Sequence, residues 1–214
     1  MTSMMTLLFL TSHLKSKICN MKHFAVTGNI GSGKSTVCSL FEFFGIPVYY
    51  SDYRAKRLMH TNKTVKKELV DLLGKSIYQE NGDLDRVKMA SKIFKDESLL
   101  KKVNSIVHPA VRKDYKKWRK EQDTPYTLQE SALTFEINAE KHVDGVILVY
   151  APKELLISRT MKRGNVTRSQ VIDRLSKQMD QELKKEKADY IIDNSMGTSL
   201  IVQITELHHN FLKK

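Results

Sequence analysis

The sequence predicts an α/β fold built on a five-stranded parallel sheet with helices on both faces. Two observations carry this prediction. Short apolar segments rich in β-prone residues alternate along the 214-residue chain with segments whose apolar residues recur at helical spacing. One of the strand segments, 144–152, is apolar at nearly every position, as expected of a strand that is covered on both faces.

The predicted strands are short. The first ends at Phe24-Ala25-Val26, and the others lie at 45–52, 124–133, 144–152 and 188–194. Helices are predicted at 35–44, 153–163, roughly 168–187 and 198–212. Residues 53–120 contain no comparable strand and are predicted to be helical, with breaks at 74–85 and 108–109. We interpret this helical insertion between two strands as a substrate-binding region.

A glycine-rich loop joins the first strand to the helix at 35–44. Gly28, Gly33, Lys34 and Ser35 match the pattern G-x-x-x-x-G-K-[ST]. Glycines let such a loop bring its N–H groups close to phosphate oxygens, and the helix N-terminus adds the positive end of its dipole. Lys34 would reach the β- and γ-phosphates of ATP, and Ser35 would bind Mg²⁺. The predicted nucleotide site is Gly28, Asn29, Ile30, Gly31, Ser32, Gly33, Lys34, Ser35 and Thr36. A glycine-rich turn without a ligand is the alternative.

The composition indicates an anionic binding partner but does not identify which class of anion it is. The formal net charge is +12, which favours an anionic partner such as a nucleic acid, an anionic membrane or a phosphate-rich substrate. The only two cysteines, Cys19 and Cys38, provide neither a disulfide framework nor metal-ligand spacing. This content suits a reducing cytoplasm, where we expect the protein to reside.

Residues 1–20 precede the first predicted strand. Their apolar stretch, MMTLLFL, is too short to span a membrane, no basic residue precedes it, and no cleavage site clearly follows it. We expect a disordered extension or a translation start assigned too early, with a weak targeting segment as the lesser alternative. The folded domain is therefore predicted to span 21–214.

Two carboxylates stand at the ends of predicted strands. Asp52 closes the strand at 45–52, and ligands of open parallel sheets bind beyond the carboxyl ends of the strands. There Asp52 could accept the proton of an attacking hydroxyl, or it could instead cap a helix that begins at Tyr53. Glu130, on the strand at 124–133, is favoured to support the water shell of Mg²⁺, because the strand at 144–152 ends without an acid.

The segment 155–178 is rich in arginine. Arg159 and Arg163 lie four residues apart and share a helix face. A Gly-Asn break follows, and Thr167 is positioned to cap a second helix that begins at Arg168. This pattern is typical of a nucleotide-kinase lid, which closes over the phosphates and neutralises charge. An ordinary basic helical hairpin is the alternative.

A second basic segment follows His108-Pro109. Proline favours the first turn of a helix, so His108 is predicted to be held extended, with Arg112 about one turn later. We interpret most of RKDYKKWRK (112–120) as a solvated helix face and Trp118 as partly buried structure rather than a base-stacking platform.

Taken together, these motifs resemble the dephospho-coenzyme A kinase family over about residues 22–212. The resemblance rests on their order: TGNIGSGKST, GIPVYYSD, HPAVR (108–112), ESALTFE (130–136), RTMKRGNVTRSQVIDRLSKQ and ADYIIDN. The phosphate loop is common to many kinases, whereas the order of all six segments is far more specific. The sequence departs from the family pattern at three places, with Asn29 in place of Gly, Tyr50 in place of Asp, and ALTFE in place of Pro-Leu-Leu-Phe-Glu.

The resemblance implies a P-loop kinase core, coenzyme-A-binding helices at about 53–120 and a lid at about 153–187. It implies that ATP, with Mg²⁺, phosphorylates the ribose 3′-hydroxyl of dephospho-coenzyme A in the last step of coenzyme A synthesis. Asp52 would be the base, with Lys34, Arg159 and Arg163 as the other catalytic residues. The implied residues of the acceptor site are Asp52, Arg54, His108 and Arg112.

The expected partner is thus a small molecule, with no nucleic acid and no membrane, and the protein is expected to be a monomer. Two rival functions stay open. One is a different small-molecule P-loop kinase, acting for example on a nucleoside monophosphate. The other is a nucleic-acid-binding P-loop ATPase, which the net charge and the 112–120 segment would suit.

Overall fold

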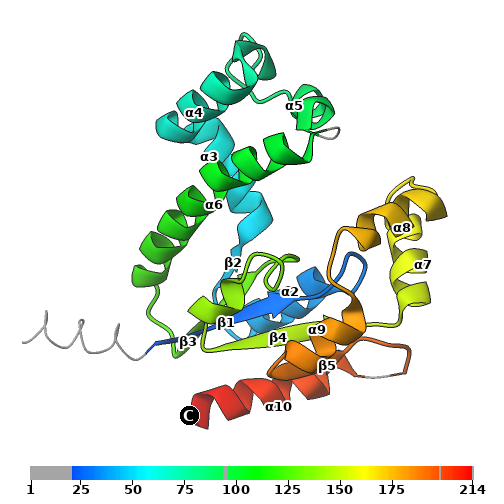
Figure 1. The fold of residues 1–214 in the computed structure, drawn as a ribbon. Coiled ribbons are helices and arrows are strands. Elements are labelled where there is room, and N and C mark those ends of the chain that lie inside the picture. Colours follow the sequence, from blue (N-terminus) through cyan, green and yellow to red (C-terminus); the bar gives the residue numbers. More distant parts are fainter. Residues whose placement is uncertain (1–20, 94–95, 198, 214) are drawn as a thin grey trace, which may run out of the picture. The chain divides into compact units, whose positions relative to one another are not determined.

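The structure, a computed structural model, describes residues 21–93, 96–197 and 199–213 (Figure 1). The extension predicted for 1–20 lies outside these residues. The chain forms two compact units: a sheet unit, made of the residues up to Tyr49 and Gln122–Lys214, and a helical unit, Tyr50–Glu121. Within the described ranges, no helix is both long and apolar enough to cross a membrane.

The sheet unit contains the five-stranded parallel sheet that the sequence predicts. Its strands are β1 (Lys22–Thr27), β2 (Val48–Tyr50), β3 (Tyr126–Glu130), β4 (Gly145–Tyr150) and β5 (Tyr190–Asp193), in the order β2-β3-β1-β4-β5. The central strand β1 pairs in parallel with β3 and β4, and Val26 lies opposite Glu130. Parallel pairing brings the carboxyl ends of β1 and β3 to the same edge, where the glycine-rich loop begins.

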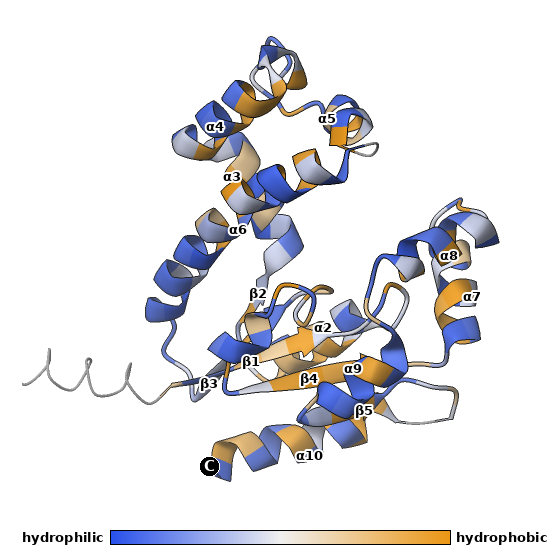
Figure 2. Ribbon diagram, viewed as in Figure 1, coloured by the Kyte–Doolittle hydropathy of each residue, from blue (hydrophilic) through white to orange (hydrophobic). Residues whose placement is uncertain are grey.

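The two faces of β1 bury different side chains, because successive residues of a strand point to opposite faces. Phe24 stacks on Phe211 of α10 (Leu200–Lys213), with ring centroids 3.9 Å apart. Ala25 packs on the other face in a cluster with Phe135 and Val146. Figure 2 shows the apolar residues concentrated along β1 and β4. Both faces are therefore covered, as the apolar strands predict.

Most helices of the sheet unit lie where they were predicted. They are α2 (Lys34–Phe43), α7 (Lys153–Arg163), α8 (Arg168–Ser176), α9 (Gln181–Lys187) and α10, with a 3₁₀ turn at η2 (Ala139–His142). The prediction of a single helix at 168–187 is wrong, because this segment forms the two helices α8 and α9. Asp180 accepts a hydrogen bond from the N–H of Glu182 (2.9 Å) and thereby starts α9 anew.

The helical unit contains α3 (Ser51–Thr61), α4 (Lys63–Leu73), η1 (Lys75–Ile77), α5 (Arg86–Ile93) and α6 (Glu97–Lys120). Its core combines Val65, Leu69 and Leu73 of α4 with a stripe at every fourth position of α6: Val103, Val107, Val111 and Tyr115. The break predicted at 74–85 is confirmed by η1 and by an isolated bridge between Tyr78 and Leu84.

The break predicted at 108–109 is wrong, because Pro109 lies inside the continuous helix α6. Proline removes one backbone hydrogen bond and crowds the preceding turn, which disfavours a helix interior. In α6 the buried stripe continues on both sides of Pro109 through Val107 and Val111, so packing outweighs this local cost. His108 is consequently helical rather than extended.

Candidate active site

The glycine-rich loop connects β1 to α2, and its shape requires glycine. Gly33 has a φ of 92°, and a Cβ there would lie 2.2 Å from Nδ2 of Asn194. Gly31 has a φ of 85°, and a Cβ there would lie 2.5 Å from the carbonyl oxygen of Leu156 in α7. A side chain at either position would combine backbone strain with a backbone or amide clash. The glycines thus allow α7 and β5 to approach the loop closely.

Lys34 begins α2 and folds back over the loop. Its Nζ donates to the carbonyl oxygens of Gly28 (2.8 Å) and Asn29 (3.3 Å). The N-terminus of α2 has no side-chain cap and no acidic residue in its first turn. Its N–H groups and the positive end of its dipole therefore face no competing carboxylate from this helix. A lysine ammonium and a helix N-terminus that converge on one loop form a suitable site for a polyphosphate.

Ser35 and Glu130 are the candidate residues for holding Mg²⁺. Ser35 lies in the first turn of α2, and its side chain is exposed. Glu130 ends β3 beside β1 and is only 9 % exposed. Burial raises the pKa of the Cys38 thiol in α2, and the charge of Glu130 raises it further. Mg²⁺ needs only one or two protein ligands when phosphates supply the others, so these residues suit it.

Asp52 is neither the last residue of its strand nor a helix cap. β2 ends at Tyr50, and α3 begins at Ser51, two residues earlier than the predicted start at Tyr53. Tyr50 occupies the N-cap position, without a side-chain cap bond. The interpretation of Asp52 as a cap is therefore wrong. Asp52 lies in the first turn of α3, where a carboxylate interacts favourably with the helix dipole.

The other predicted acceptor-site residues belong to the helical unit. Arg54 of α3 forms an ion pair with Asp114 of α6, with Nη1 and Oδ2 3.5 Å apart. His108 and Arg112 lie one turn apart in α6, with His108 half-buried and Arg112 exposed. Burial lowers the pKa of His108, and the charge of Arg112 lowers it further, so the imidazole favours the neutral form.

The helix, break and helix predicted for the lid segment are present as α7 and α8, separated by residues 164–167. As predicted, Thr167 caps α8, and the cap is a reciprocal capping box with Gln170. Arg163 is exposed at the end of α7, whereas Arg159 is partly buried. Nη1 of Arg159 is buried without a hydrogen-bond partner among the residues that the structure describes. A buried guanidinium N–H without a partner is costly, so this group is suited to bind an anion.

Two groups of loop contacts were not predicted. The Asn194 side chain donates to the carbonyl of Ser32 (2.7 Å), directly after β5. Asn29, which stands where the family pattern has Gly, is not among the described residues with positive φ. Its side chain is instead buried and donates to the carbonyl of Met179 (3.1 Å). One weak signal for these contacts is present in the sequence, namely polar residues directly following a strand or a helix.

Comparison with known proteins identifies the family. The family described as Dephospho-CoA kinase matches residues 23–199. The chain belongs to the dephospho-CoA kinase family. A dephospho-CoA kinase from Bacteroides fragilis is 37% identical over 183 residues, covering 85% of this chain and 89% of the relative. Another from Aquifex aeolicus is 40% identical over 177 residues, covering 82% and 89%.

Solved structures agree with this membership of the dephospho-CoA kinase family. The crystal structure of a Thermus thermophilus protein superposes with a TM-score of 0.82 at 31% identity, covering 90% of this chain and 98% of that one. A dephospho-CoA kinase from Campylobacter jejuni superposes with a TM-score of 0.64 at 26% identity, covering 89% and 97%. The similarity therefore extends over nearly the whole described chain.

Proposed function

We propose that the protein transfers the γ-phosphoryl group of ATP to the ribose 3′-hydroxyl of dephospho-coenzyme A, giving coenzyme A and ADP. One observation carries this proposal. A complete phosphate loop, with Lys34 folded over it, lies at the carboxyl edge of the sheet in a member of the dephospho-CoA kinase family. The family membership supports the acceptor, and the loop supports the donor.

The loop and its neighbours would bind the donor nucleotide. Backbone N–H groups from the loop and from the first turn of α2 would hold the phosphates, and Lys34 would release its loop carbonyls to reach them. Ser35, with Glu130 nearby, would hold Mg²⁺. When bound, this ion would neutralise part of the charge of the phosphates.

Asp52 would take the proton from the acceptor hydroxyl. The support is its position in the chain: it follows β2 by two residues, and strands of a parallel sheet end at the edge that carries the ligand. With the capping interpretation excluded, the structural role that competes with this one is the interaction of the Asp52 carboxylate with the dipole of α3. Arg54, His108 and Arg112 of the helical unit are proposed to bind the anionic and polar groups of the acceptor.

Arg159 and Arg163 would neutralise the charge of the transferring group. The support is strongest for Arg159, whose buried Nη1 has no partner among the described residues. Arg168 is less suited to this role because its guanidinium already bonds to Glu154 (2.7 Å). A cytoplasmic location and a monomeric state remain predictions from the sequence.

A panel of acceptors tests the proposed function. ADP release is measured with ATP and Mg²⁺ in the presence of dephospho-coenzyme A, AMP, CMP, shikimate or RNA. We expect turnover with dephospho-coenzyme A alone. Equal or faster turnover with another small acceptor would identify a different kinase. RNA-stimulated hydrolysis that falls steeply with salt concentration would identify a nucleic-acid-dependent ATPase.

A further inference from the structure

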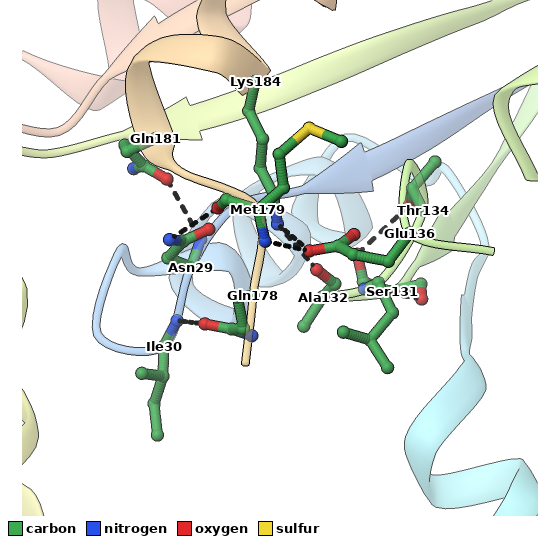
Figure 3. A network of polar contacts seen from close by, with 12 residues as sticks. Asn29, Ile30, Ser131, Ala132, Thr134, Glu136, Gln178, Met179, Gln181 and Lys184 are labelled. Atoms are coloured by element: carbon green, nitrogen blue, oxygen red, sulfur yellow. Dashed lines mark hydrogen bonds and ion pairs between the residues drawn. The ribbon is translucent and has the colours of Figure 1, made fainter. Parts of the chain in front are cut away.

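The turn between α8 and α9 is bonded directly to the start of the phosphate loop (Figure 3). Oε1 of Gln178 accepts the backbone N–H of Ile30 at 3.0 Å, and Oε1 of Gln181 accepts that of Asn29 at 3.3 Å. In return, the Asn29 side chain donates to the carbonyl oxygen of Met179 at 3.1 Å. Three hydrogen bonds thus join segments that are 148 to 152 residues apart in the chain.

The same turn is fixed from its other side by a carboxylate. Oε1 of Glu136 accepts the N–H of Met179 at 2.7 Å and forms an ion pair with Nζ of Lys184 at 3.0 Å. Lys184 is fully buried and also donates to the carbonyl oxygen of Ala132 at 2.9 Å. Breaking a buried ion pair of this kind is costly, so Gln178 projects from a rigid support.

The loop segment Asn29–Gly31 is therefore contacted by both ends of the lid. On one side it is bonded to Gln178 and Gln181, which follow α8. On the other side Gly31 lies against the backbone of Leu156 in α7, close enough that a Cβ would clash. The lid arginines Arg159 and Arg163 belong to this same helix. A shift of the loop would consequently disturb the positions of the arginines.

The N–H groups of Asn29 and Ile30 donate to the side-chain oxygens of Gln181 and Gln178. These hydrogen bonds therefore help to fix the backbone conformation at the start of the loop. Residues further along the loop and the start of α2 remain to bind phosphate. A backbone cradle for phosphate depends on the direction of each N–H group, which small displacements change. The side chain that holds Ile30 in place should therefore influence nucleotide binding without touching the nucleotide.

We propose that Gln178 and Gln181 are positioning residues that hold the phosphate loop in its nucleotide-binding shape and in register with the arginine lid. The proposal rests on the proposed function for its kinetic consequences and deepens it by adding residues outside the loop. Removing the Gln178 amide should weaken nucleotide binding and lower kcat. The KM for the acceptor should not change, because the hydrogen bond described for the Gln178 side chain goes to the phosphate loop, on the donor side of the site.

The test compares two glutamines that make the same kind of bond. Gln178→Ala removes the acceptor of the Ile30 N–H, whereas the control Gln170→Ala removes the acceptor of the Thr167 N–H (2.9 Å), a bond internal to the lid. Titration calorimetry measures the Kd of Mg²⁺–ADP without any acceptor present. Steady-state kinetics then give kcat and the two KM values, and thermal melting gives the Tm of each variant.

For Gln178→Ala we expect the Kd of ADP and the KM of ATP to rise roughly 3- to 10-fold, the range that one neutral hydrogen bond supports. The Tm and the acceptor KM should match those of Gln170→Ala. An ADP Kd equal to that of the control, or an equal rise in the acceptor KM, would overturn the proposal. If Gln178→Ala does not fold, Gln178→Asn shortens the side chain by one methylene and is judged by the same criteria.

This design separates failure of the inference from failure of the proposed function. Wild-type turnover with dephospho-coenzyme A tests the function alone. The comparison of ADP affinities tests the positioning role even if the acceptor proves to be another molecule.

Discussion

Different kinds of interaction stabilise the surroundings of the phosphate loop, in the sheet unit, and the interior of the helical unit. Around the phosphate loop, many of the described contacts are polar and have a specific partner, as the Gln178–Ile30 hydrogen bond and the Lys184–Glu136 ion pair illustrate. In the helical unit, α4 and α6 present apolar stripes, and each side chain shares its burial with several neighbours. Polar contacts of this kind cannot be exchanged for one another, whereas apolar packing tolerates substitution when volume is kept. Single changes near the loop should therefore affect function more sharply than changes in the helical unit.

Lys34→Ala is expected to have the largest effect on turnover. The transferring phosphoryl group would lose its main positive side chain, and kcat should fall roughly 10³- to 10⁵-fold, comparable to removing another cation from a phosphoryl-transfer site. The Tm should stay near the wild-type value because the Lys34 ammonium bonds to the carbonyl oxygens of Gly28 and Asn29, which belong to the loop just before its own helix. Near-normal turnover would exclude the loop as the site of the donor phosphates.

Asp52→Asn tests the residue whose role depends on the acceptor rather than the donor. The amide keeps the shape of the side chain but cannot accept a proton, so kcat should fall roughly 10²- to 10⁴-fold. The Kd of Mg²⁺–ADP should be unchanged in Asp52→Asn, whereas a substitution in the phosphate loop should raise it. A fully active Asp52→Asn protein would show that the hydroxyl loses its proton elsewhere.

Lys184→Met and Leu69→Ala compare the two units directly. Removing the buried ammonium leaves Glu136 without its charge partner, at a cost of about 3 kcal/mol in the free energy of unfolding. Leu69→Ala should cost a similar amount, about 2–5 kcal/mol, through the cavity that it leaves in the helical unit. Calorimetry should find weaker ADP binding for Lys184→Met only. Equal ADP affinities in the two variants would contradict the proposed link between Glu136, the α8–α9 turn and the loop.

Pro109→Ala should have the smallest effect, and it should be stabilising. Alanine restores a backbone donor and relieves the crowding within α6, while the buried stripe is unchanged. The free energy of unfolding should rise by about 1 kcal/mol, less than the full helix propensity difference because proline also restricts the unfolded chain. Urea denaturation of the two proteins, followed by circular dichroism, measures the change. A loss of stability would show that the proline is structurally required.

The sequence predicted features whose causes are local. The five strands are apolar runs, and the loop needs glycine for its backbone geometry. The Thr167 cap belongs to a capping box formed by residues 167–170, which a short window of sequence contains. The helix predicted at 35–44 corresponds to α2 within one residue at each end, and Gly45 follows it in the left-handed conformation common after helices.

The errors and omissions concern contacts between distant segments. Pro109 breaks a helix by local rules, but the packing of Val107 and Val111 keeps α6 continuous. The helix restart at Asp180 rests on a local cap that the sequence analysis missed. The bond between Gln178 and Ile30, by contrast, joins residues 148 positions apart, which no short window of sequence contains. The role of Asp52 follows from strand order and family resemblance, so it stays a prediction.

The position of the phosphate added to the acceptor tests the central claim most directly. The wild-type protein is incubated with ATP, Mg²⁺ and dephospho-coenzyme A, and the product is examined by phosphorus NMR with proton coupling. The account predicts a new phosphomonoester signal coupled to the ribose 3′ proton, in an amount equal to the ADP released. ADP release without this signal, or a phosphate coupled to a different proton, would contradict it.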